Sequence, residues 1–178
     1  MMKINEHCSI FPITPKEIPE VICYFLDSDP ADHKKRGTDT SKLPSFAEWH
    51  SYMLSEHEKP LEEKSYFCLG WWHDDQLIGH SCIDHIEFGN ESFTHLHIWK
   101  PEFRYKKLGQ SLFWLSLQYY FKHFELKRIY CQPNANNSAP NQVLRDLGFK
   151  LVKNYKTIPH PICFEQYVNL YVLEVPEN

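Results

Sequence analysis

The stretch PEFRYKKLGQSLF, residues 101–113, decides the fold because it joins two segments of different pattern. The preceding residues, THLHIWK (94–100), alternate like a β-strand, whereas SLFWLSLQYYF (111–121) is apolar enough to form a buried helix. The junction therefore predicts a strand that leads through a tight turn into the N-terminus of a helix.

Three cations and a glycine gather at this predicted turn: Arg104, Lys106, Lys107 and Gly109. A helix N-terminus presents unpaired N–H groups and the positive end of the helix dipole, so it binds phosphate groups. Gly109 would let a phosphate approach the backbone, and the cations would add charged donors. We interpret the turn as a pyrophosphate site. The alternative is a surface turn whose charges keep the chain in solution.

The composition favours one packed domain that covers residues 1–178, because 42% of the residues are apolar and 15% are aromatic. A formal net charge of −4 argues against a general nucleic-acid or membrane-surface binder. The six cysteines show no CxxC spacing, and no run of eighteen apolar residues occurs. We expect a cytoplasmic monomer or homodimer with reduced thiols.

The patterning along the chain predicts a mixed α/β layer structure with one continuous sheet. Strands are expected at residues 8–13, 66–72, 76–86, 93–99, 128–133, 150–158 and 163–175. Helices are expected after the capping boxes Thr14–Glu17 and Ser45–Glu48, from about Lys107 onward, and from Asn137 to Leu147 before Gly148. The polar segment 30–44 is predicted to be a loop.

Two motifs together resemble one protein family. The first is Arg104-Tyr105-Lys106-Lys107-Leu108-Gly109, and the second is Asn137, a short helix and Leu147-Gly148-Phe149. In this order they resemble the GNAT superfamily of acyl-CoA N-acyltransferases, and the second motif is most similar to the branch of ribosomal-protein N-acetyltransferases. The resemblance implies the GNAT fold, a mixed, mostly antiparallel sheet of six to seven strands flanked by about four helices.

The resemblance also implies acetyl-CoA as cosubstrate, an amine as acceptor and no metal ion. Backbone N–H groups of His97 and Trp99 would hold the thioester and the pantetheine arm. The turn would hold the pyrophosphate, and Asn137 would form a hydrogen bond with the pantetheine or with the sheet edge beside it. The cofactor-binding residues expected on this basis are His97, Trp99, Arg104, Lys106, Lys107, Leu108, Gly109, Gln110 and Asn137.

The sequence departs from the family pattern at three positions. Lys107 replaces the first glycine of the phosphate loop, Leu144 stands where many relatives have a tyrosine acid, and Gln132 stands where ribosomal-type enzymes often have a glutamate base. Neither Leu144 nor Gln132 can exchange a proton at neutral pH. The usual acid and base are therefore both absent from these places.

The remaining catalytic candidates are His95 and His97, which share one face of the strand 93–99. Histidine can accept a proton from an ammonium group near neutral pH, so His95 is the candidate base. The alternative is a packed histidine in an enzyme that works by positioning alone. Segment 30–44 and the last two strands are expected to form the acceptor side. The acceptor stays open between a protein N-terminus, a small amine and an amino acid.

Two other functions remain possible for this sequence. A domain that binds acyl-CoA without catalysis would explain the missing acid and base. A metal site is the third reading, since potential ligands lie on two neighbouring strands: His80, Cys82, Asp84, His95 and His97. However, a hairpin that turns about Asn90 would place His95 opposite His85 and the first three ligands on the other face, so no metal is expected.

Overall fold

The computed structural model describes residues 2–3, 6–103 and 108–175. Within these ranges one sheet of eight strands has the order β1-β2-β3-β4-β5-β6-β8-β7. The strands are β1 (Met2–Lys3), β2 (Cys8–Pro12), β3 (Tyr66–His73), β4 (Gln76–Glu87), β5 (Glu91–Ile98), β6 (Arg128–Cys131), β7 (Lys150–Thr157) and β8 (Gln166–Glu174). Among these described strands only β5 and β6 pair in parallel. The predicted mostly antiparallel sheet is confirmed, with the two-residue β1 as an additional edge strand.

The described part of the chain has five α-helices where about four were predicted. They are α1 (Ile18–Leu26), α2 (Pro30–Arg36), α3 (Phe46–Glu58), α4 (Leu108–His123) and α5 (Ser138–Asp146). None of them is both long and apolar enough to cross a membrane.

The additional helix, α2, lies in the segment predicted to be a loop. The Asp29 side chain accepts a hydrogen bond from the N–H of Ala31 at 2.7 Å, Pro30 occupies the first helical position, and Gly37 ends the helix at φ 82°. These are ordinary start and stop signals. The prediction missed them because the polar segment between them has no apolar periodicity.

The helix α1 begins three residues later than its capping box suggests. Both the N–H and the hydroxyl of Thr14 bond the Glu17 carboxylate, at 2.9 and 2.5 Å, but the helix starts at Ile18. A start at Pro15 would place Pro19 inside the helix, where its ring clashes with the preceding turn and it lacks an N–H. A start at Ile18 leaves Pro19 in the first turn, where proline is tolerated. The second capping box, Ser45–Glu48, forms as predicted.

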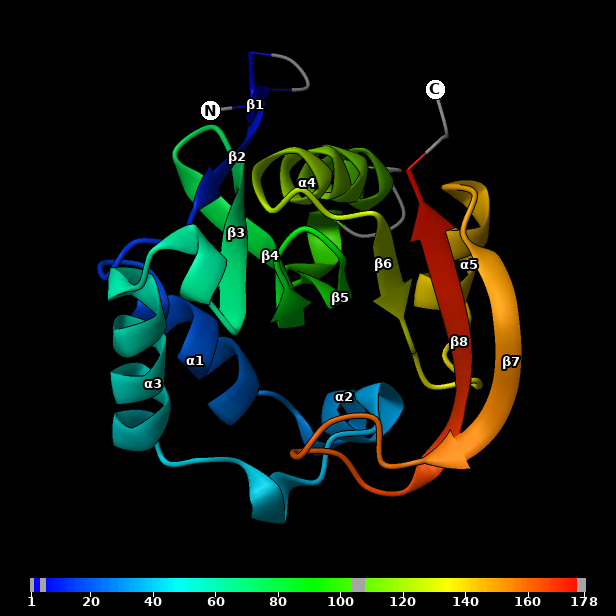
Figure 1. Cartoon of the computed structure of the whole chain (residues 1–178). Coiled ribbons are helices and arrows are strands. Elements are labelled where there is room, and N and C mark those ends of the chain that lie inside the picture. The colour runs from blue at the N-terminus through cyan, green and yellow to red at the C-terminus, as the bar shows by residue number, and fades with distance from the viewer. Residues whose placement is uncertain (1, 4–5, 104–107, 176–178) are drawn as a thin grey trace.

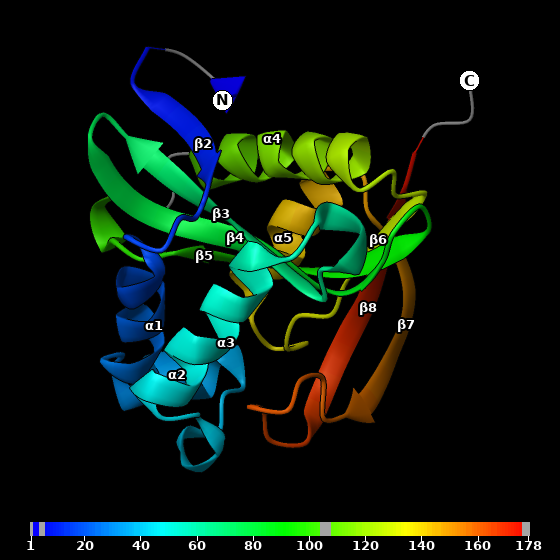
Figure 2. The same cartoon turned by 60° about the vertical axis from the view of Figure 1, so that its left-hand side comes forward.

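Helices cover both faces of the sheet (Figures 1 and 2). On one face α4 and α5 close a core that contains Trp71, Phe113 and Phe149. On the other face α1 and α3 close a second core that contains Ile22 and Met53. The two cores hold the central strands rigidly, so side chains on β4 and β5 are fixed in position.

The pairing of β4 with β5 differs from the predicted hairpin. Cys82, not His85, lies opposite His95. A β-bulge between Asp84 and Glu87, with His85 at φ 47°, shifts the register. Because a shift of one residue moves a strand's side chains to the opposite face, the polar side chains of β4 share a face with the histidines of β5, contrary to the prediction.

The strands β5 and β6 separate soon after they meet. Their parallel ladder runs only from Glu91↔Arg128 to Phe93↔Tyr130. Beyond this point β6 pairs with β8, and Figure 1 shows β5 and β6 diverging toward the side of α2. The rest of β5 therefore has a partner strand on its β4 side only.

Candidate active site

A cavity of about 180 Å³ lies where β5 leaves β6. Its walls come from both halves of the sheet and from loops far apart in sequence. They include His95 and His97 of β5, Gln132 after β6, Asn137 before α5, Arg36 of α2 and His160 between β7 and β8.

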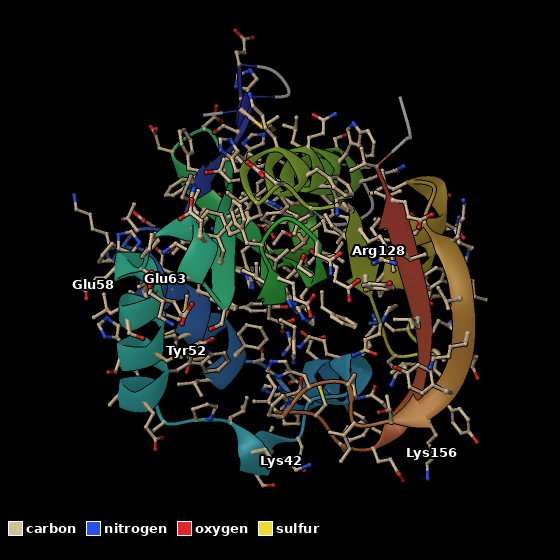
Figure 3. The ribbon with its side chains drawn as sticks, in the orientation of Figure 1. Lys42, Tyr52, Glu58, Glu63, Arg128 and Lys156 are labelled. Atoms are coloured by element: carbon tan, nitrogen blue, oxygen red, sulfur yellow. The ribbon has the colours of Figure 1, made fainter. Side chains whose placement is uncertain are left out.

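The segment that follows α2 is joined to the β7–β8 connection beside this cavity. The N–H of Asp39 donates to the carbonyl of Ile162 at 2.8 Å, and the N–H of Phe164 donates to the carbonyl of Gly37 at 3.2 Å. The ammonium of Lys42, labelled in Figure 3, donates to the carbonyl of Cys163 at 2.9 Å. These two segments, which were expected to form the acceptor side, thus meet at the wall of the cavity.

Asp84 organises the histidines at the centre of the site. Its Oδ2 lies 3.0 Å from Nε2 of His95 and 3.5 Å from Nε2 of His160, and its Oδ1 lies 2.9 Å from Nδ1 of His85. Burial would raise the pKa of the Asp84 carboxyl, but the charge of His95 and the hydrogen bonds from His95 and His85 hold it well below its usual range. Asp84 is therefore ionised at neutral pH.

The hydrogen bond to Asp84 sets the pKa of His95 and determines which ring nitrogen carries the proton. Burial lowers the pKa of His95, but the charge and hydrogen bond of Asp84 outweigh it, so the pKa is raised above 6.5. Because a carboxylate only accepts, Nε2 of His95 carries the proton of this bond, and Nδ1 of the neutral ring keeps its lone pair. His95 is thus oriented to take up a proton at Nδ1.

His97 and His80 have the opposite character. Burial, followed by the charges of His80 and Arg36, holds the pKa of His97 well below 6.5. Burial lowers the pKa of His80 to about 3. The two rings stack at 4.8 Å, Nδ1 of His97 lies 3.4 Å from the hydroxyl of Tyr24, and Nδ1 of His80 accepts a 2.8 Å bond from the indole of Trp99. Both rings are neutral near pH 7; His97 lines the cavity, and the fully buried His80 packs behind it.

The main-chain N–H groups of His97 and Trp99, which were expected to hold the thioester and the pantetheine arm, point toward β4. The N–H of Trp99 donates to the carbonyl of Ile78 at 2.9 Å, so it is engaged with β4. Along the β4–β5 ladder the N–H of His97 points the same way, since orientation repeats every second residue. The N–H of Leu96 points instead toward the gap beside β6, beyond the last rung of the β5–β6 ladder at Phe93↔Tyr130, and Leu96 lines the cavity.

Gly109 lies in the first turn of α4, as predicted, but its missing side chain has a different reason. A Cβ at this position would lie 2.3 Å from Cδ1 of Ile98 on β5. The glycine therefore lets α4 pack closely against the end of β5. Leu108 and Gln110 flank it in the same turn, whereas the cations Arg104, Lys106 and Lys107 lie outside the described residues.

Asn137 presents an unmatched acceptor at the cavity. Its Oδ1 is buried and has no hydrogen-bond partner within the described ranges, although a buried polar atom normally has one. The pantetheine arm of CoA carries amide N–H groups that could supply this bond. The chemistry of the site thus fits that cosubstrate at this position.

Two departures from the family pattern have structural roles here. Leu144 is fully buried in the core under α5. Gln132 donates to the carbonyl of Pro159 at 3.0 Å and accepts from the hydroxyl of Tyr155 at 2.8 Å. Gln132 thus ties the end of β6 to β7 and the connection that follows it.

The contact between Asp84 and His95 is the feature of this site that the sequence did not predict. The predicted hairpin register places Asp84 on the opposite face, whereas the observed register places it beside His95. The residues that the structure describes contain no group of three or more His, Cys, Asp or Glu side chains able to hold a metal ion.

The sequence model of the acetyltransferase (GNAT) family matches residues 35–149, more than half of the chain. No curated protein sequence matches the chain.

Solved structures share the whole fold at low sequence identity. A RimL ribosomal L7/L12 alpha-N-protein acetyltransferase in complex with coenzyme A is 13% identical with a TM-score of 0.76, and the match covers 97% of this chain and 96% of that one. The ribosomal-protein-S5-alanine acetyltransferase from Vibrio fischeri is 17% identical with a TM-score of 0.76, over 96% and 94%. The spermidine N-acetyltransferase from Vibrio cholerae, in complex with CoA and spermine, is 14% identical with a TM-score of 0.77, over 96% of each chain.

Proposed function

Since the chain belongs to the acetyltransferase (GNAT) family, we propose that the cavity between β5 and β6 transfers an acetyl group from acetyl-CoA to a primary amine, with His95 as the base. The observation that carries this proposal is the Asp84–His95 pair, an oriented proton acceptor in the wall of the cavity. A protein that only bound acyl-CoA would have no need of this pair.

Acetyl-CoA supplies an activated acetyl group, whose bond to sulfur breaks as the bond to the amine nitrogen forms. An acceptor that binds as an ammonium ion gives up two protons, one before it can attack and one as the amide forms. In this proposal the unpaired side of β5 at Leu96 and the acceptor oxygen of Asn137 orient the pantetheine arm. The first turn of α4, which packs against Ile98, brings its N–H groups to the same end of β5 for the pyrophosphate.

Nδ1 of His95 would accept the first proton, which leaves the amine able to attack, and the second proton would pass to water. Asp84 stabilises the imidazolium that results, as the raised pKa of His95 indicates. Leu144 cannot protonate the departing sulfur, so we propose that CoA leaves as the thiolate. This is chemically reasonable because a thiol with an ordinary pKa near 8.5 is a good leaving group.

The test is acetyl transfer by the purified protein to an amine panel of peptide N-termini, polyamines and amino acids. CoA is quantified by chromatography, because the six cysteines of the protein would react with thiol reagents, and the acetylated amine is identified by mass spectrometry. We expect one CoA for each acetylated amine. If the protein binds acetyl-CoA but acetylates none of the amines, the proposed enzymatic activity is refuted, and the alternative of a domain that binds acyl-CoA without catalysis remains.

A further inference from the structure

Arg36 is a cation in the wall of the cavity. Its Nη1 donates to the hydroxyl of Tyr24 at 2.6 Å, and its Nη2 lies 3.4 Å from Nδ1 of His33. The guanidinium lies over the rings of Tyr24 and Phe25, at 4.9 and 5.6 Å from their centroids. Among the described residues no acidic side chain forms an ion pair with it.

One donor of this guanidinium has no partner among the residues that the structure describes. Nε of Arg36 is buried and makes no hydrogen bond in the part of the chain that the structure describes. Arg36 as a whole is half-buried, but a buried donor without an acceptor is costly, and aromatic faces compensate only in part. A ligand that brings an anionic acceptor would remove this cost.

The positive charge acts inside the cavity. After burial and the charge of His80, the charge of Arg36 contributes to the low pKa of His97. His97 also touches the Tyr24 hydroxyl that Arg36 holds. His95 lies two residues before His97 on β5, so the Cα atoms of the two residues are about 7 Å apart. The cavity thus has a positive end at Arg36 and a negative charge, Asp84, behind His95.

We propose that Arg36 binds a carboxylate of the acceptor, so that the preferred substrates are small amines that also carry a carboxylate group. This inference rests on the proposed acetyl transfer. The ammonium group of such a substrate is attracted toward Asp84 and His95 while its carboxylate pairs with Arg36. A cavity of about 180 Å³ is below the roughly 300–1,000 Å³ of sites for drug-sized ligands, which favours a small acceptor.

The same charge disfavours one of the acceptor classes left open by the sequence. A polyamine carries only positive charges, so Arg36 repels it. The carboxylate that Arg36 binds could belong to a free amino acid or to the acidic side chain of a peptide's N-terminal residue. The experiment distinguishes these two acceptors.

The experiment compares leucine, leucinamide and 3-methylbutylamine as acceptors, which share one side chain and differ in the carboxylate. The peptides Asp-Ala-amide and Asn-Ala-amide test the second source. Parent protein, Arg36→Gln, Arg36→Lys and Lys35→Gln are measured with saturating acetyl-CoA. Lys35 is exposed on the same helix, so Lys35→Gln removes the same charge away from the cavity. Because the amines differ in basicity, each variant is compared with the parent on the same acceptor.

We expect Arg36→Gln to lower kcat/KM for the carboxylate acceptor by about tenfold to a hundredfold, mostly through KM, because a hydrogen bond to a charged group is lost. The loss on 3-methylbutylamine should be less than about threefold. Arg36→Lys should retain part of the activity, and Lys35→Gln should match the parent.

Arg36 also packs on Tyr24, so a second measurement avoids the variants. The parent should be inhibited by 4-methylpentanoate, competitively with the acceptor, at least about tenfold better than by the corresponding amide. Equal inhibition by acid and amide, or equal losses on all acceptors, would overturn the assignment of Arg36. If only the acceptors that lack a carboxylate are acetylated, the inference is contradicted and the proposed function stays intact. If no acceptor is acetylated, the proposed function itself is contradicted.

Discussion

At the scale of single residues, His95 depends on Asp84 for both its orientation and its basicity. Burial alone would lower the pKa of His95, and only the carboxylate at 3.0 Å raises it. A general base acts in its neutral form, so activity should rise as the pH increases through this raised pKa. The sequence predicted His95 and Asn137 as site residues, and both lie in the cavity wall. It did not predict the contact of Asp84 with His95, because a bulge in β4 changes the register by one residue.

The pH dependence of kcat/KM tests this pair. In the parent, the acid limb should have its midpoint above pH 6.5. In Asp84→Asn the burial effect dominates, so the midpoint should move below pH 6.5. His95→Gln should lose activity on the order of a hundredfold near neutral pH, and less at high pH, where the amine is already neutral.

His85→Gln is the control, because His85 bonds the same carboxylate from the exposed side. It should keep most of the activity. If parent and His95→Gln follow one curve set by the pKa of the acceptor amine, His95 is only a wall residue and the enzyme works by positioning.

At the scale of elements, local signals predicted most helices, and tertiary packing explains the differences. The Ser45–Glu48 box starts α3 as expected, whereas Pro19 delays α1 and the polar α2 lacks the periodicity that would have revealed it. The packing of α4 on β5 could not be predicted either, because the contact between Gly109 and Ile98 depends on the relative position of two elements.

The substitution Gly109→Val tests this contact. Helix propensity alone favours valine over glycine by a few tenths of a kcal/mol. Overpacking against Ile98 should instead destabilise the protein by about 1–3 kcal/mol. The measurement is the free energy of unfolding in urea. Ile98→Ala makes room, so the double variant should be more stable than the sum of the single changes predicts. Stabilisation by Gly109→Val alone would show that α4 does not pack in this way.

At the scale of the whole molecule, the order of elements and two short motifs were enough to predict the GNAT fold. Alternating strands and capped helices place the sheet and its layers, and these patterns are local in the sequence. The cavity depends on longer-range features, namely the divergence of β5 from β6 and the joining of the α2 end to the β7–β8 connection. These features depend on tertiary contacts that no local pattern records.

The central claim is that this cavity binds CoA along the unpaired side of β5, beside Asn137. The most direct measurement is the thermal unfolding midpoint with and without CoA, for the parent, Asn137→Ala and Asn136→Ala. Asn136 is an exposed neighbour of the same residue type and serves as the control.

CoA at a hundred times its Kd should add about 2.7 kcal/mol, which raises the Tm of a chain of this size by about 5–10 °C. Loss of the Asn137 hydrogen bond should weaken binding about tenfold and halve this shift at the same CoA concentration, whereas Asn136→Ala should behave like the parent. No shift in the parent at millimolar CoA would contradict the account.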